Sequence, residues 1–178
     1  MCSSDLYPEK SIGRVKMFYG NFAVVIRALT YVLTLGKEGI REASQNAVLN
    51  ANYMMARLKE KYTMAYDEIC MHEFVMCLVK LHDETGCSAL DVAKGMLDFD
   101  LHPPTMYFPL IVHEALMVEP CETESKELMD EVCDIYLKLY DMAYNDPQAL
   151  HDAPLKTPVR RLDEVAAARN MILRYKFA

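Results

Sequence analysis

The chain has 178 residues, and 52% of them are hydrophobic, which is enough for one domain with a substantial core. Its formal net charge of −7 argues against nucleic acid as a partner. The longest apolar run, residues 22–35, is interrupted by Arg27 and is too short for a membrane span, so no membrane partner is expected.

The first predicted element is a helix over residues 22–35, which is apolar nearly all round. We expect this helix to be buried and to end at Gly36, which suits a left-handed C-cap. Asn21 precedes the helix and is expected to cap it, with substrate contact as the less favoured alternative. Apolar residues then recur at helical spacing, which predicts an amphipathic helix over residues 38–61.

Asn46, Asn50 and Asn52 lie within this second helix. Asparagine is a poor helix former, so we expect tertiary contacts to retain these residues. Two strands are predicted next, over residues 62–66 and 69–79. The second strand has apolar side chains on both faces, which predicts a strand that is covered on both sides.

A short helix is predicted to begin after Ser88 and to reach about Phe99, with Asp91 completing a capping box. Asp100 follows the helix and tolerates a left-handed backbone. A further strand is predicted over residues 115–119. Helices and strands alternate without a repeated βαβ rhythm, so the predicted fold class is α+β, with helices packed on a small antiparallel sheet.

The last long helix is predicted from Thr123, as its N-cap, to about Tyr144, where Asn-Asp-Pro ends it. Its inner face is expected to consist of Leu128, Val132, Ile135, Leu139 and Met142. Residues 155–178 then carry six basic and two acidic side chains, a net +4, which leaves −11 on the remainder. This basic tail is expected to fold back on the acidic body, to reach a partner, or to form a solvated helix.

Residues 102–126 form the most informative stretch of the sequence. Pro103 and Pro104 fix their own φ and force an extended path at His102 and Thr105. Binding loops are often stiffened in this way. The polar side chains that this stretch offers are those of Thr105, Tyr107, Glu119, Glu122 and Thr123.

No metal site is expected. Neither His72-Glu73 nor His113-Glu114 completes the H-E-x-x-H pattern of zinc enzymes, because methionine stands where the second histidine belongs. A site assembled from His102, His113 and Cys121 gains no support from their spacing, and His72 is expected to be a hydrogen-bonded core histidine. The six cysteines lack CxxC spacing and are expected to be reduced thiols.

Several further blocks occur in a fixed order along the chain. They are Ser-Ile-Gly-Arg-Val at 11–15, Tyr-Gly-Asn-Phe at 19–22, Asn-Ala-Val-Leu-Asn-Ala-Asn-Tyr at 46–53, Met-His-Glu-Phe-Val at 71–75 and Thr-Pro-Val-Arg-Arg-Leu-Asp-Glu-Val at 157–165. Together with residues 102–126, these blocks resemble the C-terminal part of subunit 2 of glycine dehydrogenase (decarboxylating), the P-protein of the glycine cleavage system. The resemblance covers about Pro8 to Arg174.

The resemblance implies the C-terminal small domain of a fold-type I enzyme that depends on pyridoxal phosphate (PLP). We expect residues 22–154 to form this domain, residues 7–21 to be a linker from a missing large domain, and residues 155–178 to be a basic tail. Residues 1–6 match the translation of a common sequencing adapter, so we expect them to be a non-native leader.

The resemblance implies a cytoplasmic enzyme that decarboxylates glycine with PLP and passes the aminomethyl group to the lipoyl arm of the H-protein. The resemblance therefore implies P-protein subunit 1, lipoylated H-protein and glycine as partners. No lysine of this chain stands in the family's His-Lys-Thr context, so neither a catalytic residue nor bound PLP is expected in this chain alone.

The resemblance also implies that His102, Thr105 and Tyr107 shape the pocket for glycine and the lipoyl arm. Packing of the small domain on the large one is an equal alternative for this loop. Further candidates for the wall of the active site are Asn21, Glu119 and Thr123, although Cys121 replaces a threonine of the family pattern. The alternative function is a stand-alone interaction or regulatory module without catalysis.

Overall fold

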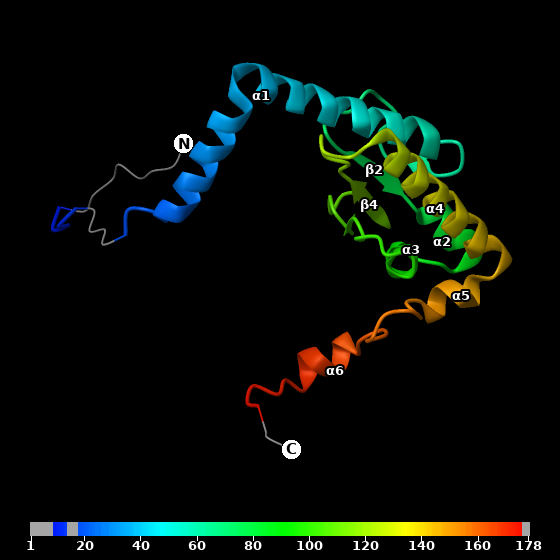
Figure 1. The fold of residues 1–178 in the computed structure, drawn as a ribbon. Helices are drawn as coiled ribbons and strands as arrows, with labels where there is room; N and C mark the ends of the chain where they lie inside the picture. The colour runs from blue at the N-terminus through cyan, green and yellow to red at the C-terminus, as the bar shows by residue number, and fades with distance from the viewer. Residues whose placement is uncertain (1–8, 14–17, 176–178) are drawn as a thin grey trace. The chain divides into compact units, whose positions relative to one another are not determined.

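The computed structural model describes residues 9–13 and 18–175, so the predicted leader at residues 1–6 lies outside the described residues. The chain divides into two compact units, Met1–Ile40 and Arg41–Ala178. Figure 1 labels the helices and strands of both units. The predicted domain boundaries after residues 6, 21 and 154 stay predictions.

Helix α1 extends over Phe22–Leu58 and is broken at Gly36, where φ is 63° and ψ is −171°. Glycine adopts a positive φ without a Cβ clash, and this break confirms the predicted end of the first helical segment. Asn21 caps that segment, because its Oδ1 accepts a hydrogen bond of 3.1 Å from the backbone N–H of Ala23. The predicted capping role of Asn21 is confirmed.

The prediction that residues 22–35 are buried is wrong for this chain. Large apolar side chains of the segment are exposed, including those of Phe22 at 75% and Leu33 at 73% of their full area. The described part of the first unit contains no other helix or strand, so that unit supplies no second layer to cover this helix.

The second unit contains a four-stranded antiparallel sheet in the order β1-β2-β4-β3. The strands are β1 (Thr63–Met64), β2 (Phe74–Cys77), β3 (Thr105–Met106) and β4 (Ala115–Val118). In the central pair, Phe74 lies opposite Val118 and Met76 lies opposite Leu116. The predicted α+β class and the predicted strand at 115–119 are confirmed, whereas the first two strands are shorter than predicted because bends occupy much of the chain between them.

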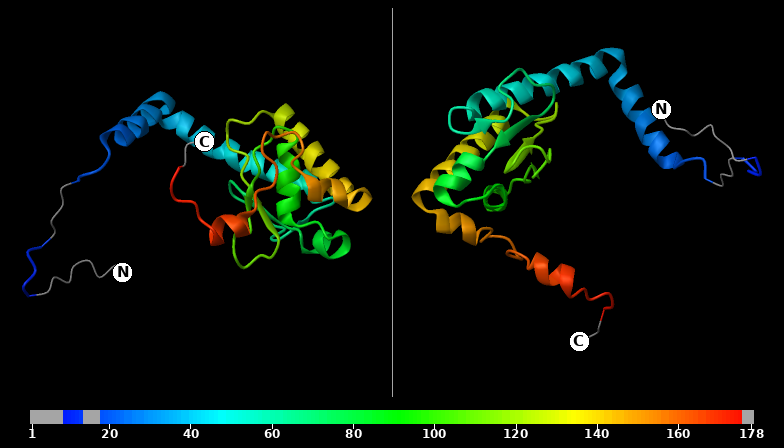
Figure 2. Two further views of the ribbon diagram at one scale, coloured as in Figure 1. Left: turned by 90° about the horizontal axis from the view of Figure 1, so that it is seen from below. Right: turned by 180° about the vertical axis from the view of Figure 1, so that it is seen from behind.

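Helices cover one face of this sheet. They are the second half of α1, α2 (Val79–Thr85), α3 (Ala89–Leu97) and α4 (Lys126–Asn145). Helix α5 (Pro147–Asp152) packs on α3 and α4, and α6 (Glu164–Arg169) follows in the tail. Figures 1 and 2 show α4 beside the second half of α1. Phe74 and Met76 face this layer and are buried, whereas Val75 and Cys77 on the opposite face are half-buried. The predicted cover of this strand is therefore complete on one face and partial on the other.

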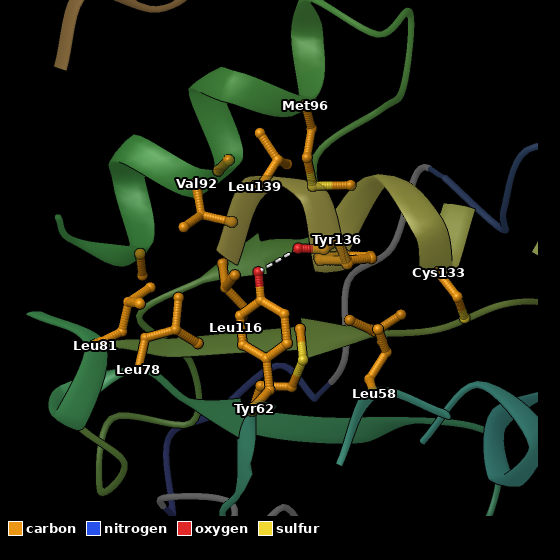
Figure 3. Packing of buried hydrophobic residues seen from close by; sticks show 14 of the residues in the cluster. Leu58, Tyr62, Leu78, Leu81, Val92, Met96, Leu116, Cys133, Tyr136 and Leu139 are labelled. Atoms are coloured by element: carbon orange, nitrogen blue, oxygen red, sulfur yellow. Dashed lines mark hydrogen bonds between the residues drawn. The ribbon is translucent and has the colours of Figure 1, made fainter. Parts of the chain in front are cut away.

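The core lies between the sheet and these helices. Figure 3 shows Leu58 of α1, Met96 of α3, Leu116 of β4 and Tyr136 of α4 meeting in one cluster of buried side chains. Tyr62 precedes β1 and is also buried, and its hydroxyl donates a hydrogen bond of 2.8 Å to the backbone oxygen of Tyr136. This bond satisfies two buried polar groups and ties the start of the sheet to α4.

Helix α3 begins as predicted. The Ser88 hydroxyl accepts a hydrogen bond of 3.2 Å from the Asp91 N–H, and Asp91 Oδ2 accepts one of 2.7 Å from the Ser88 N–H. These two bonds form the predicted capping box. After the helix, Asp100 has a φ of 59°, which confirms its predicted left-handed backbone.

Helix α4 begins later than predicted. Its N-cap is Ser125, whose Oγ accepts a hydrogen bond of 3.2 Å from the Leu128 N–H, so the prediction that Thr123 caps this helix is wrong. Thr123 instead lies in the preceding turn. Both residues carry a hydroxyl, and the one that directly precedes the first helical turn takes the capping position.

The inner face of α4 is also displaced from the predicted line. Leu128 is 40% exposed. The predicted Leu139 is buried, and the predicted Val132, Ile135 and Met142 are half-buried against the core. The other fully buried positions of the helix are Met129, Cys133, Tyr136 and Ala143. Helix α4 ends at Asn145, as the Asn-Asp-Pro sequence predicts. Pro147 then opens α5, a short helix that was not predicted from the sequence. Among the described residues, no helix has the length and apolar character to cross a membrane.

Candidate functional site

A groove of about 460 Å³ opens in the second unit between α4, the end of β4 and the loop that joins α3 to β3. The residues of the double-proline stretch form one wall, namely His102, Pro103, Pro104 and Thr105. The opposite wall comes from the first half of α4. The stretch that sequence analysis identified as most informative therefore lines a cavity.

The floor of the groove is apolar. Met54 of α1, Met96 of α3 and Met129 of α4 line it and are buried. Leu128 and Val132 continue the apolar surface along α4. Thioether side chains are unbranched and flexible, so such a floor adapts to aliphatic groups of different shape. This floor was not predicted from the sequence, because its residues come from three helices far apart in the chain.

Asn50 fixes the segment that carries the groove's acidic residues. This asparagine is buried on α1, and its Nδ2 donates hydrogen bonds to the backbone oxygens of Cys121 at 2.9 Å and Glu124 at 3.4 Å. Asn52 makes a similar link, because its side chain exchanges hydrogen bonds of 2.8 and 3.0 Å with the backbone of Cys70. The predicted tertiary contacts of Asn50 and Asn52 are confirmed.

Polar groups of the groove stand at its rim. His102, Thr105 and Glu119 line the groove and have exposed side chains. Glu119 Oε1 lies 3.9 Å from Nε2 of His72, and His72 is 54% exposed. The prediction that His72 is a core histidine is wrong, because β2 begins at Phe74 and His72 lies in the bend before it.

Tyr107, Thr123 and Asn21 are not among the residues that line the groove. Tyr107 has a φ of 56° and donates its backbone N–H to the Ala115 oxygen at 2.8 Å. Burial of its hydroxyl and the negative charge of Glu114 raise the pKa of Tyr107. Asn21 belongs to the first unit, where it caps α1. The structure thus brings together His102, Thr105 and Glu119, and any contact of these residues with a substrate stays a prediction.

An ionic network that sequence analysis missed joins α1 to α4 near the groove. Asp130 accepts hydrogen bonds from the Tyr53 hydroxyl, from Arg57 at 2.5 Å and from Lys126 at 2.6 Å. Hydrogen bonding from Lys126, followed by that from Tyr53, lowers the pKa of Asp130 to about 2. Only the i,i+4 spacing of Lys126 and Asp130 is visible in the sequence.

The family described as "Glycine dehydrogenase, C-terminal domain" matches residues 43–154. The chain therefore belongs to this family, which confirms the resemblance seen in the sequence. A probable glycine dehydrogenase (decarboxylating) subunit 2 from Treponema denticola is 59% identical over 172 residues, which cover 97% of this chain and 36% of the relative. The corresponding protein from Fervidobacterium nodosum is 53% identical, with the same coverage.

The relative from Thermotoga maritima, also a probable glycine dehydrogenase (decarboxylating) subunit 2, is 50% identical over 169 residues, or 95% of this chain and 36% of the relative. The chain thus spans about a third of the length of the curated relatives that it matches. Similarity at this level extends beyond residues 43–154 to nearly all of the chain.

The groove does not fit PLP. Among the described residues that line it, the charged side chains are those of Glu119 and Glu124, and none is a lysine or an arginine. PLP needs a lysine amine for its covalent link and hydrogen-bond donors for its phosphate. Two carboxylates would instead repel a phosphate. Within the described residues, no group of three or more His, Cys, Asp or Glu side chains is arranged to hold a metal ion.

Proposed function

We propose that this chain forms the C-terminal domain of a glycine dehydrogenase (decarboxylating) subunit 2. In the complete enzyme, glycine loses carbon dioxide with the help of PLP, and the remaining aminomethyl group passes to the lipoyl arm of the H-protein. The observation that carries the proposal is 59% identity to such a subunit over 97% of this chain. The proposed setting is cytoplasmic, with P-protein subunit 1 as the other half of the enzyme.

The chain contributes a wall of the active site and leaves the cofactor to the rest of the enzyme. This division is supported by the groove's lining, which offers carboxylates but no lysine. A cofactor lysine and a phosphate site must then come from outside the described groove. We assign no catalytic residue to this chain.

The groove formed by His102, Thr105 and Glu119 receives the aliphatic part of the lipoyl arm and borders the glycine site. Its methionine-rich floor suits an unbranched apolar chain, and its polar rim supplies hydrogen-bonding groups where that chain ends. Tyr107 and Thr123 hold the loops on either side of the groove in place. Asn21, which caps α1 in the first unit, stays a proposed wall residue of the complete enzyme and is separate from this groove.

The large domain of the enzyme covers the exposed apolar side chains of residues 22–35. Eight large apolar side chains in this segment are at least 42% exposed, which is more than a stable surface helix usually shows. They are Phe22, Val24, Val25, Ile26, Leu29, Tyr31, Val32 and Leu33.

A chimera tests the proposed function. The part of the Treponema denticola relative that precedes its matched segment is joined to this chain and combined with P-protein subunit 1 and lipoylated H-protein. The proposal expects glycine-dependent release of labelled carbon dioxide from this chimera. The same assembly without this chain is the matched control and should be inactive.

An inactive chimera that still binds PLP and subunit 1 would contradict the proposal. It would favour a non-catalytic interaction or regulatory module derived from this domain. The unmodified relative, assayed in parallel, establishes that the partner proteins are competent.

A further inference from the structure

The start of the basic tail, together with the two residues before it, is attached to helix α3 at both ends of that helix. We call this segment, residues 153–161, the strap. At the C-terminal end of α3, the Asp98 carboxylate accepts hydrogen bonds from the backbone N–H groups of Leu155 and Lys156, both at 2.7 Å. The Lys156 ammonium in turn donates to the Asp98 backbone oxygen at 2.8 Å. These bonds show that the tail folds back on the acidic body, one of the alternatives left open by the sequence.

At the N-terminal end of α3, Arg161 forms the second anchor. Its Nη2 donates to Asp91 Oδ1 at 2.6 Å and to the backbone oxygen of Leu150 at 2.9 Å, and its Nε donates to the backbone oxygen of Ala153 at 2.8 Å. Asp91 is buried, and Arg161 supplies a positive charge beside it in addition to the hydrogen bonds from the Ser88 N–H and hydroxyl. His151 Nδ1 also lies 3.5 Å from Asp91 Oδ1. The guanidinium thus joins α3, α5 and the strap in one network.

The loop that lines the groove begins and ends close to these two anchors. It starts at Asp98, the C-cap of α3, and continues through His102 and Thr105 to Tyr107. The Tyr107 N–H donates to the Ala115 oxygen at 2.8 Å, and the adjacent Glu114 carboxylate accepts a hydrogen bond of 2.6 Å from the Ala89 N–H at the start of α3. This end of the loop therefore lies near the N-terminus of α3. The backbone N–H groups of residues 98–101 donate to the last carbonyls of α3 at 3.0–3.2 Å, so the helix end also holds the start of the loop.

We propose that the strap holds the α3–β3 loop in position, so that Arg161 and Asp98 are positioning residues of the groove. Asp98 links the two segments directly, because its side chain binds the strap while its backbone begins the loop. Releasing the strap removes the hydrogen bonds to the Asp98 carboxylate. It also removes Lys156 Nζ, which lies 5.4 Å from the centroid of the Phe99 ring, and leaves Lys138 Nζ over that ring at 4.7 Å. The wall that carries His102 then loses one of the two attachments at its start, and the backbone bonds to the end of α3 remain.

Hydrogen exchange of the full chain, followed by mass spectrometry, tests this proposal with Arg161→Ala and Asp98→Asn. In both variants we expect roughly tenfold faster exchange at the backbone amides of the strap and of residues 98–107. Exchange in residues 129–143 of α4 should stay unchanged. Arg160→Ala is the matched control, because it removes an exposed neighbouring charge, and it should exchange like the parent chain. Arg161→Lys keeps the charge beside Asp91 but not the fork of donors, so its exchange should lie between those of the parent chain and Arg161→Ala.

Faster exchange in the strap without a change in residues 98–107 would overturn the proposal. Unchanged exchange in both segments would overturn it as well. If Arg161→Ala also accelerates exchange throughout α4, the packing of the core has been disrupted in that variant. The result for Asp98→Asn then decides whether the strap positions the loop. Faster exchange throughout α4 in Asp98→Asn would contradict the proposal, because these contacts would then support the whole core rather than the loop. The test reads structure rather than turnover, so its failure is distinct from failure of the proposed function.

Discussion

At the scale of single residues, His102 is the polar side chain of the groove on which the proposed function depends most. We predict that His102→Ala lowers turnover or glycine affinity of the complete chimeric enzyme by up to roughly tenfold, the effect of losing one hydrogen bond. The measurement is steady-state release of labelled carbon dioxide at varied glycine. His82→Ala is the control, because His82 is exposed on α2 and does not line the groove.

Unaltered turnover and glycine affinity in His102→Ala would leave only a packing role for this loop. An equal effect of His82→Ala would show that the loss of activity is not specific to the groove.

Asp130 makes the stability of the second unit dependent on pH. Its pKa is lowered from 3.8 to about 2 by the hydrogen bonds of the folded state. A carboxyl with a depressed folded-state pKa stabilises the fold above its unfolded pKa, and this contribution is lost as pH falls through the folded-state value. We predict that Asp130→Asn lowers the free energy of unfolding at pH 7, and that the difference from the parent chain shrinks between about pH 4 and about pH 2.

Urea unfolding at several pH values measures this difference. Asp134→Asn serves as the control. Asp134 also pairs with Arg57, but its side chain is 69% exposed, so this ion pair should contribute less to the free energy of unfolding. A pH-independent difference between Asp130→Asn and the parent chain would contradict the assignment of the shift to Asp130.

At the scale of elements, the N-terminus of α4 gives a direct comparison of two hydroxyl residues. We predict that Ser125→Ala lowers the free energy of unfolding by about 1 kcal/mol, because the Leu128 N–H loses its acceptor. Thr123→Ala should change it by less than about 0.5 kcal/mol, because Thr123 lies in the preceding turn. Urea unfolding of both variants provides the measurement. A larger effect of Thr123→Ala would restore Thr123 as the cap.

Local signals in the sequence predicted where most elements begin and end. Ser88 with Asp91, Gly36 and Pro147 act on backbone groups within a few residues of themselves, so their effects are readable without the fold. Thr123 and Ser125 offer the same hydroxyl chemistry two positions apart, and only the packing of α4 decides between them. Burial was predicted less well, because whether residues 22–35 are covered depends on surroundings that the sequence of one segment does not specify.

The groove was predictable in part. The two prolines identified the loop that forms its wall, and the asparagines of α1 indicated tertiary contacts. Its floor and the network around Asp130 depend on side chains from different helices, whose meeting is a property of the packed unit. The contact between Arg161 and Asp91 spans 70 positions of sequence and left no local pattern to read.

At the scale of the whole molecule, the exposed apolar residues 22–35 predict self-association of the isolated chain. We expect light scattering to show concentration-dependent aggregates, and we expect the pair of substitutions Val25→Lys and Leu33→Glu to reduce them. Ile69→Lys is the control, because Ile69 is equally apolar and exposed but lies in the second unit. A monodisperse parent chain that unfolds cooperatively would contradict this prediction.

The proposed function makes this chain part of a PLP enzyme whose cofactor is held outside the groove described here. The most direct measurement is titration of the purified chain with PLP, followed by absorbance for a lysine adduct and by release of labelled carbon dioxide from glycine. We predict no saturable adduct and no release, because the groove offers carboxylates where the cofactor needs an amine and a phosphate site. A stoichiometric adduct with glycine-dependent release from this chain alone would contradict the claim.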